Sequence, residues 1–415
     1  MTTPDSDVIA QARPIRPSVQ LLPLLKAALA LAALALLQSL YNLPADRPMV
    51  FIVAGAAAIQ LGSFRSGREL LHAGAFAAVA ASWYVIAAGH PYASWHDWLS
   101  LCVSALGVGA FASLCVRSFA VSNDAHAFYS LKSAAILPAF ALAASLAMQF
   151  SLNFPRETFD LYLYKFDGQL GFQASFWCGR LLDHHPALKE FESVMYDALG
   201  VMPAVVFAVG LSLKRRLPFN PLAVFVWAGL AAYCLYQICP GTAPFAVFHG
   251  GFPSNPPPSS SFALQRIEVP GSWRNAMPSM HVTWALLAFS CSIALPLWTR
   301  WLTGAFVALT CLATLGLGQH YLIDLIVACP FTVAVSAACV RVPFSTPARS
   351  QAFAIGSLAT LAWLVVLRLG WLTAEPSTIA WLTIIATLAG SAILQTRLLL
   401  ADQRLATDAA ASDAS

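Results

Sequence analysis

Apolar residues gather into about twelve long runs, and short polar stretches separate most of them. The runs cover roughly residues 19–42, 48–63, 70–90, 98–119, 131–151, 193–213, 219–238, 280–297, 300–317, 321–340, 352–371 and 379–400. Each is close to the ~20 residues that a helix needs to cross a hydrocarbon core ~30 Å thick. The pattern therefore predicts an all-α integral membrane protein, a polytopic bundle of ten to twelve transmembrane helices.

The polar stretches divide this bundle into parts. Two long loops, 152–192 and 239–279, interrupt the series of runs, and both ends of the chain are polar. We expect disordered cytoplasmic tails, an N-terminal group of membrane helices, a central membrane domain that contains both long loops, and a C-terminal group of helices. The corresponding residues are 1–18 and 401–415 for the tails, then 19–151, 152–340 and 341–400.

Composition supports a membrane protein and gives little sign of other partners. The chain is 59% hydrophobic and only 10% charged, whereas a soluble domain has about 25% charged residues. A net charge of +4 is too small to indicate a nucleic-acid partner, and the nine cysteines show no metal-ligand spacing. We predict neither a metal ion nor a cofactor.

Lys and Arg in the short loops predict the orientation, because such loops carry more positive charge on the cytoplasmic side. Arg65, Lys214 to Arg216, Arg300 and Arg341 all fall in alternate loops, on the same side as both tails. We expect cytoplasmic termini and outer positions for both long loops. The protein would then lie in a bacterial inner membrane with an active site facing the periplasm, or the lumen in a eukaryote.

Two histidines are predicted to meet at the outer face. His281 lies in "RNAMPSMHVTWALLAF" (274–289), at the start of an apolar run. The chain turns at Arg300 and returns to "GLGQHYLIDLIVACP" (316–330), which places His320 39 residues after His281 and on the same side of the membrane. Ionisable groups in membrane helices are costly and usually functional.

Neighbouring residues suit these histidines to phosphoryl transfer. Asp324 follows His320 at i+4, so a helix would place both side chains on one face and let the carboxylate orient the imidazole. Pro278 and Ser279 are typical of a helix start, where free backbone N–H groups bind anions. One histidine could attack phosphorus while the other protonates the leaving oxygen.

Other interpretations of these residues remain open. A histidine at a membrane interface is often only a hydrogen-bonded structural residue. Two histidines and a carboxylate can also bind iron or zinc, although no further ligand has a suitable spacing. A transporter could use the same group as a proton relay, but its side chains would then lie near the middle of the membrane rather than at one rim.

The motifs "PSMH" (278–281) and "HYLID" (320–324) resemble the second and third motifs of the type 2 phosphatidic acid phosphatase superfamily. With "YQICPGTAPF" (236–245), the closer resemblance is to its inositol-phosphorylceramide synthase branch. The resemblance implies a six-helix catalytic core in the C-terminal two-thirds of the chain. It also implies that His320 forms a phosphohistidine, that Asp324 orients it, and that His281 is the acid and base.

The chain departs from the phosphatase pattern at its cations. It has no KxxxxxxRP motif, and Ala313 and Thr314 stand where phosphatases have Ser and Arg. We expect Ser279, Arg266 and Arg274 to bind the phosphate instead, and Lys165 and Arg180 are further candidate cations. Because a diester carries less charge than a monoester, this favours headgroup transfer from a phospholipid donor to a lipid or polyol acceptor, and the resemblance implies that the headgroup is like an inositol phosphate. The alternative is a phosphatase acting on phosphatidic acid or a polyprenyl phosphate.

Overall fold

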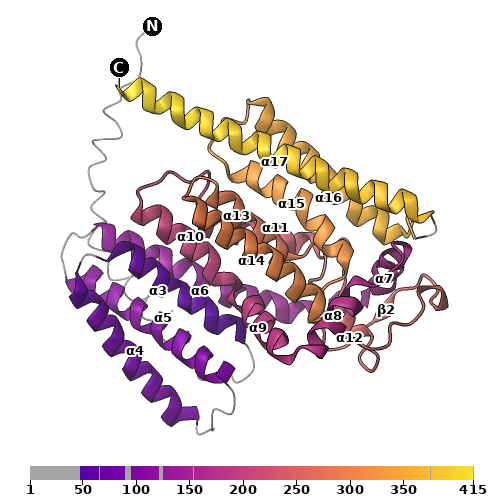
Figure 1. The fold of residues 1–415 in the computed structure, drawn as a ribbon, viewed down its shortest axis with the longest axis horizontal. Helices are drawn as coiled ribbons and strands as arrows, with labels where there is room; N and C mark the ends of the chain where they lie inside the picture. The colour runs from indigo at the N-terminus through magenta and orange to yellow at the C-terminus, as the bar shows by residue number, and fades with distance from the viewer. Residues whose placement is uncertain are drawn as a thin grey trace.

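The computed structural model describes residues 47–64, 66–88, 95–120, 125–152, 154–373 and 375–414. In these residues the protein is a bundle of α-helices with one short antiparallel strand pair, so the predicted all-α fold class is confirmed (Figure 1). The first predicted apolar run, 19–42, and the N-terminal tail lie outside the described residues.

Four helices form the N-terminal part of the bundle: α3 (Arg47–Ser63), α4 (Gly67–Ala88), α5 (Trp95–Ala120) and α6 (Ala125–Ser151). Small residues let them approach closely, as is common between membrane helices. A Cβ at Gly107 of α5 would lie 2.4 Å from the Val53 carbonyl oxygen of α3, and one at Gly109 would lie 2.3 Å from the Ala73 oxygen of α4. Both contacts are too short for any residue except glycine.

The first long loop is largely helical. It contains α7 (Asp160–Gln169), α8 (Ala174–His184) and the first part of α9 (Pro186–Asp197). A 3-10 turn, η1 (Ala198–Gly200), joins α9 to α10 (Val201–Ser212), and together they form one apolar candidate span, Pro186–Ser212. This span begins before the predicted run at 193, because the first residues of α9 are too polar to raise hydropathy.

The second long loop holds only short elements: α12 (Pro244–Val247), η2 (Ser259–Ser261) and β2 (Ile267–Glu268). Strand β2 pairs with β1 (Glu157–Thr158) of the first long loop, with Glu157 opposite Glu268. The two outer loops are therefore joined to each other. Elements α7, α8, α12 and β2 lie together at one end of the bundle (Figure 1).

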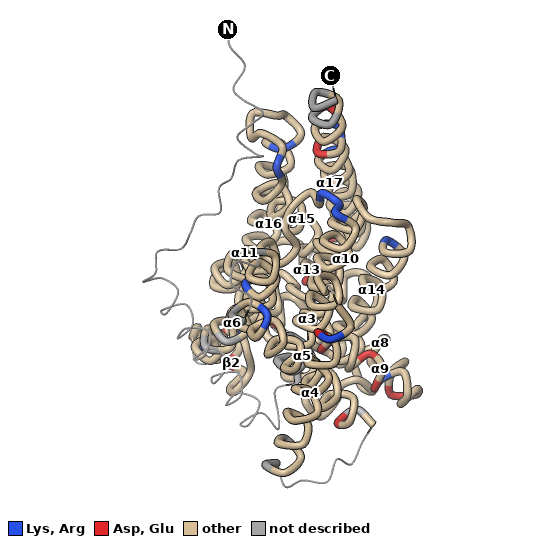
Figure 2. Tube along the Cα trace, turned by 90° about the vertical axis from the view of Figure 1, so that its left-hand side faces the viewer, with Lys and Arg blue, Asp and Glu red and all other residues tan. Residues whose placement is uncertain are grey.

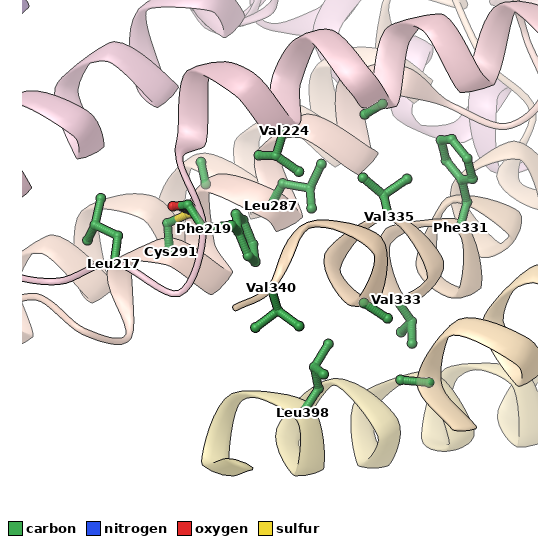
Figure 3. Packing of buried hydrophobic residues seen from close by; sticks show 14 of the residues in the cluster. Leu217, Phe219, Val224, Leu287, Cys291, Phe331, Val333, Val335, Val340 and Leu398 are labelled. Atoms are coloured by element: carbon green, nitrogen blue, oxygen red, sulfur yellow. Dashed lines mark hydrogen bonds between the residues drawn. The ribbon is translucent and has the colours of Figure 1, made fainter. Parts of the chain in front are cut away.

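The centre of the bundle is built by α11 (Pro221–Leu235), α13 (Met280–Ser292), α14 (Leu297–Gly316) and α15 (Leu322–Cys339). Buried side chains from α11, α13 and α15 pack with Leu398 in a single hydrophobic cluster (Figure 3). Phe331 and Leu287 belong to this cluster and are 4% and 2% exposed. It holds the helices that carry the two histidines in a fixed relation.

The chain ends with α16 (Pro347–Leu369) and α17 (Ser377–Ala414), and α17 lies along one edge of the bundle beside α15 and α16 (Figure 1). The expected disordered tail at 401–415 is helical as far as Ala414. Its alanines, leucine, glutamine and arginine are strong helix formers, so the last turns can continue the membrane helix without apolar cover.

Six helices among the described residues are long and apolar enough to cross a membrane, and three shorter apolar helices accompany them. The predicted number of about twelve spans is not confirmed. Lys and Arg gather around the ends of α10, α14 and α16 towards one end of the bundle, where α17 also carries acidic residues, and further acidic residues lie near α8 and α9 towards the other end (Figure 2).

Candidate active site

The start of α13 is fixed by Ser279. The Ser279 hydroxyl accepts a hydrogen bond from the Val282 N–H at 3.5 Å, so this residue is the N-cap that the sequence predicts. Its own N–H donates to the Asp324 backbone carbonyl at 3.1 Å. This bond ties the first turn of α13 directly to the first turn of α15.

His320 lies in the tight turn that joins α14 to α15. The N–H groups of Gln319 and His320 both donate to the Thr314 carbonyl, and the Ser175 hydroxyl of α8 donates to the His320 carbonyl at 2.7 Å. Gly318 has φ +70°, a left-handed conformation that glycine adopts without strain. The backbone around His320 is therefore held from both sides.

Asp324 orients the His320 ring. The His320 Nδ1 lies 3.3 Å from Asp324 Oδ2, and the same oxygen accepts the Tyr321 N–H at 2.8 Å. With a proton on Nδ1 facing the carboxylate, Nε2 keeps its lone pair. Burial lowers the pKa of His320 to about 4, and the Ala276 backbone carbonyl partly opposes this shift. The imidazole is thus neutral, and nucleophilic, near pH 7.

His281 faces His320 from the first turn of α13. The centroids of the two rings are 6.0 Å apart. His281 also stacks on Tyr196 of α9, with ring centroids 3.9 Å apart and planes 19° from parallel. The stack fixes the plane of the His281 ring, so a phosphorus atom placed between the histidines would meet two oriented imidazoles.

Both histidines line one cavity of about 520 Å³. Its wall combines the outer loops with α6, α11 and α13, and none of the described residues that line it is a lysine or an arginine. Its lining residues are Phe140, Ala141, Ala144, Ser145, Met148, Tyr196, Asp197, Leu199, Gly200, Phe225, Ala243, Phe245, Ala246, Gly271, Ser272, Trp273, Asn275, His281, Trp284, Gln319 and His320.

The two arginines expected to bind phosphate lie elsewhere. Arg274 is 3% exposed, and its guanidinium donates to the backbone carbonyls of Leu152, Pro155, Arg156 and Ser272. Arg266 pairs with Glu157 at 2.7 Å, and both side chains are about half exposed. Neither lines the cavity, and Ser279, whose hydroxyl caps α13, does not line it either. The structure therefore brings His281, His320 and Asp324 together, with Ser279 beside them in the buried first turn of α13, and leaves the two arginines outside the cavity.

Sequence reasoning missed two buried carboxylates beneath His320. Asp167 of α7 accepts the N–H groups of Leu322 and Ile323, at 2.7 and 3.1 Å, and so caps the start of α15. Asp160 accepts the Tyr321 hydroxyl at 3.0 Å and the Thr242 N–H at 2.9 Å. The signal was present, because Asp160 and Asp167 are seven residues apart and so share the face of the helix that also carries Leu163 and Tyr164.

Within the described ranges, no group of three or more His, Cys, Asp and Glu side chains is arranged to hold a metal ion. The residues that line the cavity include His281, His320 and Asp197, and Asp324 contacts the His320 ring.

Residues 161–338 match the family model of the PAP2 superfamily. The PAP2-like segment runs from α7 to α15 and includes His281, His320 and Asp324, while α3 to α6, α16 and α17 lie outside it. No curated protein and no solved structure matches the chain. The PAP2 match supports a lipid phosphatase or phosphotransferase type of function, and it does not distinguish between branches of the superfamily.

Proposed function

We propose that this protein is a membrane lipid phosphotransferase that moves a phospho-headgroup, such as an inositol phosphate, from a phospholipid donor to a lipid or polyol acceptor. The observation that carries this proposal is the cavity around His281 and His320, whose described lining contains no lysine or arginine. A phosphate monoester carries up to two negative charges and needs cations to neutralise them. A diester carries one and suits this cavity better.

The reaction has two displacements. His320 Nε2 attacks phosphorus, a nitrogen–phosphorus bond forms, and the bond between phosphorus and the leaving oxygen breaks as His281 donates a proton to that oxygen. The acceptor hydroxyl then attacks phosphorus, gives its proton to His281, and releases His320. Asp324 keeps its charge and holds the Nδ1 proton throughout. The 6.0 Å between the two rings leaves room for a phosphoryl group.

A phosphorus-labelled donor and a rapid quench test this mechanism. Phosphohistidine survives alkali and is lost in acid, so we expect alkali-stable, acid-labile label on the purified protein and none on His320→Ala. His185→Ala is a matched control, because His185 is exposed on the loop before α9 and does not line the cavity. Full turnover by His320→Ala on every phospholipid tried would rule out the proposal.

Hydrolysis is the second candidate, since water can replace the acceptor hydroxyl at the same site. The two activities separate in vesicles that contain a headgroup-bearing phospholipid, phosphatidic acid and an acceptor lipid. We expect headgroup exchange to exceed phosphate release from phosphatidic acid. The opposite ratio would assign the protein to the lipid phosphate phosphatases, with the same two histidines.

We also propose that both termini are cytoplasmic and that the site opens on the outer side of the membrane. The Lys and Arg distribution in the short loops supports this orientation. Ser260 lies in η2 of the second outer loop. A cysteine introduced there into a cysteine-free background should react with an impermeant thiol reagent in intact cells, and reaction only after lysis would reverse the orientation.

A further inference from the structure

Part of the cavity wall comes from α6. Phe140, Ala141, Ala144 and Met148 of this helix line the cavity together with Ser145. Residues 140 and 148 are eight apart, which corresponds to about 12 Å along a helix. The α6 helix lies outside the PAP2-like segment, so part of this cavity is built by the additional N-terminal helices.

Aromatic rings connect this wall to His281. The Phe140 ring meets Phe225 of α11 edge-on at 5.6 Å and Trp284 of α13 at 6.1 Å. Trp284 stacks on Phe225 at 4.1 Å, and its ring lies 6.5 Å from the His281 ring. The surface beside His281 is therefore continuous and apolar as far as α6.

Close packing fixes the position of this aromatic group. The Trp284 indole N–H donates to the Phe225 carbonyl at 2.8 Å, so the polar atom of the ring is satisfied away from the cavity. A Cβ at Gly229 would lie 2.3 Å from Phe140 Cζ, so this glycine makes the space that the Phe140 ring fills. Two of the other α6 residues that line the cavity are alanines, Ala141 and Ala144. Their small side chains leave the cavity wide at this point.

We propose that the α6 wall receives a hydrocarbon chain of the lipid substrate, and that Ala144 sets the chain length that the enzyme accepts. This inference rests on the proposed function. A hydrocarbon chain fits the wall better than a headgroup does, because the α6 residues offer apolar contact and only the Ser145 hydroxyl. The phosphate would lie between the histidines, and the chain would extend along α6 into the membrane.

Neighbouring alanines provide a matched test. Ala144 lines the cavity, whereas Ala143 is exposed on the outer surface of the same helix. We expect Ala144→Phe to lower the ratio of kcat/KM for a long-chain over a short-chain phospholipid by about tenfold or more, because the added ring fills the wall. Ala144→Leu should give a smaller change in the same direction, and Ala143→Phe should leave the ratio unchanged. Equal ratios in all four proteins would overturn the inference.

A binding measurement separates this inference from the proposed function. A phospholipid with a photoreactive diazirine near the end of its chain is bound to wild-type protein and to His320→Ala, irradiated, and mapped by mass spectrometry. We expect label on Phe140, Ala141, Ala144 or Met148 that excess unlabelled phospholipid removes. Label confined to exposed residues such as Ala143 and Phe150 would overturn the inference. If wild-type protein turns over no lipid but the α6 wall is labelled, the proposed function fails and the chain site stands.

Discussion

Glu69 in the N-terminal helices and Asp324 beside His320 are both withdrawn from solvent, and their partners differ. Glu69 pairs with the Arg117 guanidinium at 2.9 Å, and the Arg117 and Glu69 side chains are 7% and 16% exposed. Asp324 is 0% exposed, and its Oδ2 contacts one imidazole and one backbone N–H. The Glu69 charge is matched by a formal cation, whereas the contacts of Asp324 Oδ2 are to neutral groups.

Glu69 therefore belongs to an ion pair that joins helices, whereas Asp324 contacts a neutral imidazole, and we propose that it supports the reaction of that imidazole. Around Glu69 the polar groups link three helices, since Arg117 of α5 also donates to the Ser63 carbonyl of α3. Around Asp324 two more buried carboxylates, Asp160 and Asp167, are held by backbone N–H groups and a tyrosine hydroxyl. In the proposed mechanism, the Asp324 carboxylate stabilises the positive charge that forms on the His320 ring when it attacks phosphorus.

Neutralising each carboxylate in turn should give the largest contrast. Asp324→Asn keeps an oxygen for the Tyr321 N–H but loses the charge that supports His320. We expect turnover to fall by about 10²–10⁴, with the thermal unfolding of the purified protein little changed. Glu69→Gln should lower the unfolding temperature and keep the turnover per folded molecule. If Asp324→Asn retains wild-type turnover, the contrast between the two sites fails.

His281→Ala should lower turnover in a way that depends on the leaving group. A lipid alkoxide needs a proton as it departs, and an activated nitrophenolate does not. We expect a loss approaching about 10²–10⁴ with a phospholipid donor and a much smaller loss with a nitrophenyl phosphodiester, measured by steady-state kinetics. Equal losses on both donors would show that His281 acts by packing against Tyr196 rather than as an acid.

Arg117→Met should destabilise the N-terminal helices without affecting the chemistry. It leaves the partly buried Glu69 without this cation, and we expect a loss of about 1–3 kcal/mol in the free energy of unfolding. Thermal unfolding in detergent measures the effect. Arg68→Met is the control, because Arg68 is an exposed residue of the same helix as Glu69. If turnover per folded molecule falls together with stability, the Arg117–Glu69 pair also affects the active site around Asp324.

Asp167 should make stability depend on pH. Burial raises its pKa to about 8, the Leu322 N–H lowers it, and the Asp324 charge adds to the rise. The folded protein then keeps a proton that the unfolded chain has lost, so the free energy of unfolding falls as pH rises from about 4 to about 8. The slope is at most about 1.4 kcal/mol per pH unit.

Asp167→Asn removes that titration and should flatten this part of the profile. The amide oxygen can still accept one of the two N–H groups at the start of α15. Unfolding temperatures of both proteins at several pH values between these limits are the measurement. An unchanged slope in Asp167→Asn would assign the pH dependence to other groups.

The sequence predicted the helical fold because apolar runs of this length have few other structures open to them. It predicted that His281 and His320 would lie close together because a tight turn makes α13 and α14 antiparallel, which returns the chain to the same side for His320, and the ring distance of 6.0 Å agrees. Their catalytic roles, and that of Asp324, remain predictions. The start of α9 and the end of α17 were harder to predict from the sequence, because both helices have polar or mixed surfaces.

The surroundings of the site depend on contacts between distant residues, which local patterns do not reveal. Arg274 lies close to the histidines in sequence, but its guanidinium is held by three backbone carbonyls from a distant part of the chain, those of Leu152, Pro155 and Arg156. Likewise, nothing local to Phe140 or Ala144 indicates that α6 lines the cavity. The sequence was sufficient to predict that the two histidines lie close together. The residues that form the cavity wall around them depend on the tertiary fold and could not be predicted from it.

The length of α17 has a mechanical consequence. Its 38 residues correspond to about 57 Å, nearly twice the ~30 Å thickness of a hydrocarbon core. Asp402, in its last third, pairs with Arg216 at 3.6 Å, which braces the helix against the turn after α10. Because one helix of this length exceeds the thickness of a single hydrocarbon core, we expect the C-terminal turns of α17 to extend beyond the bilayer, with the Arg216–Asp402 pair close to the membrane surface.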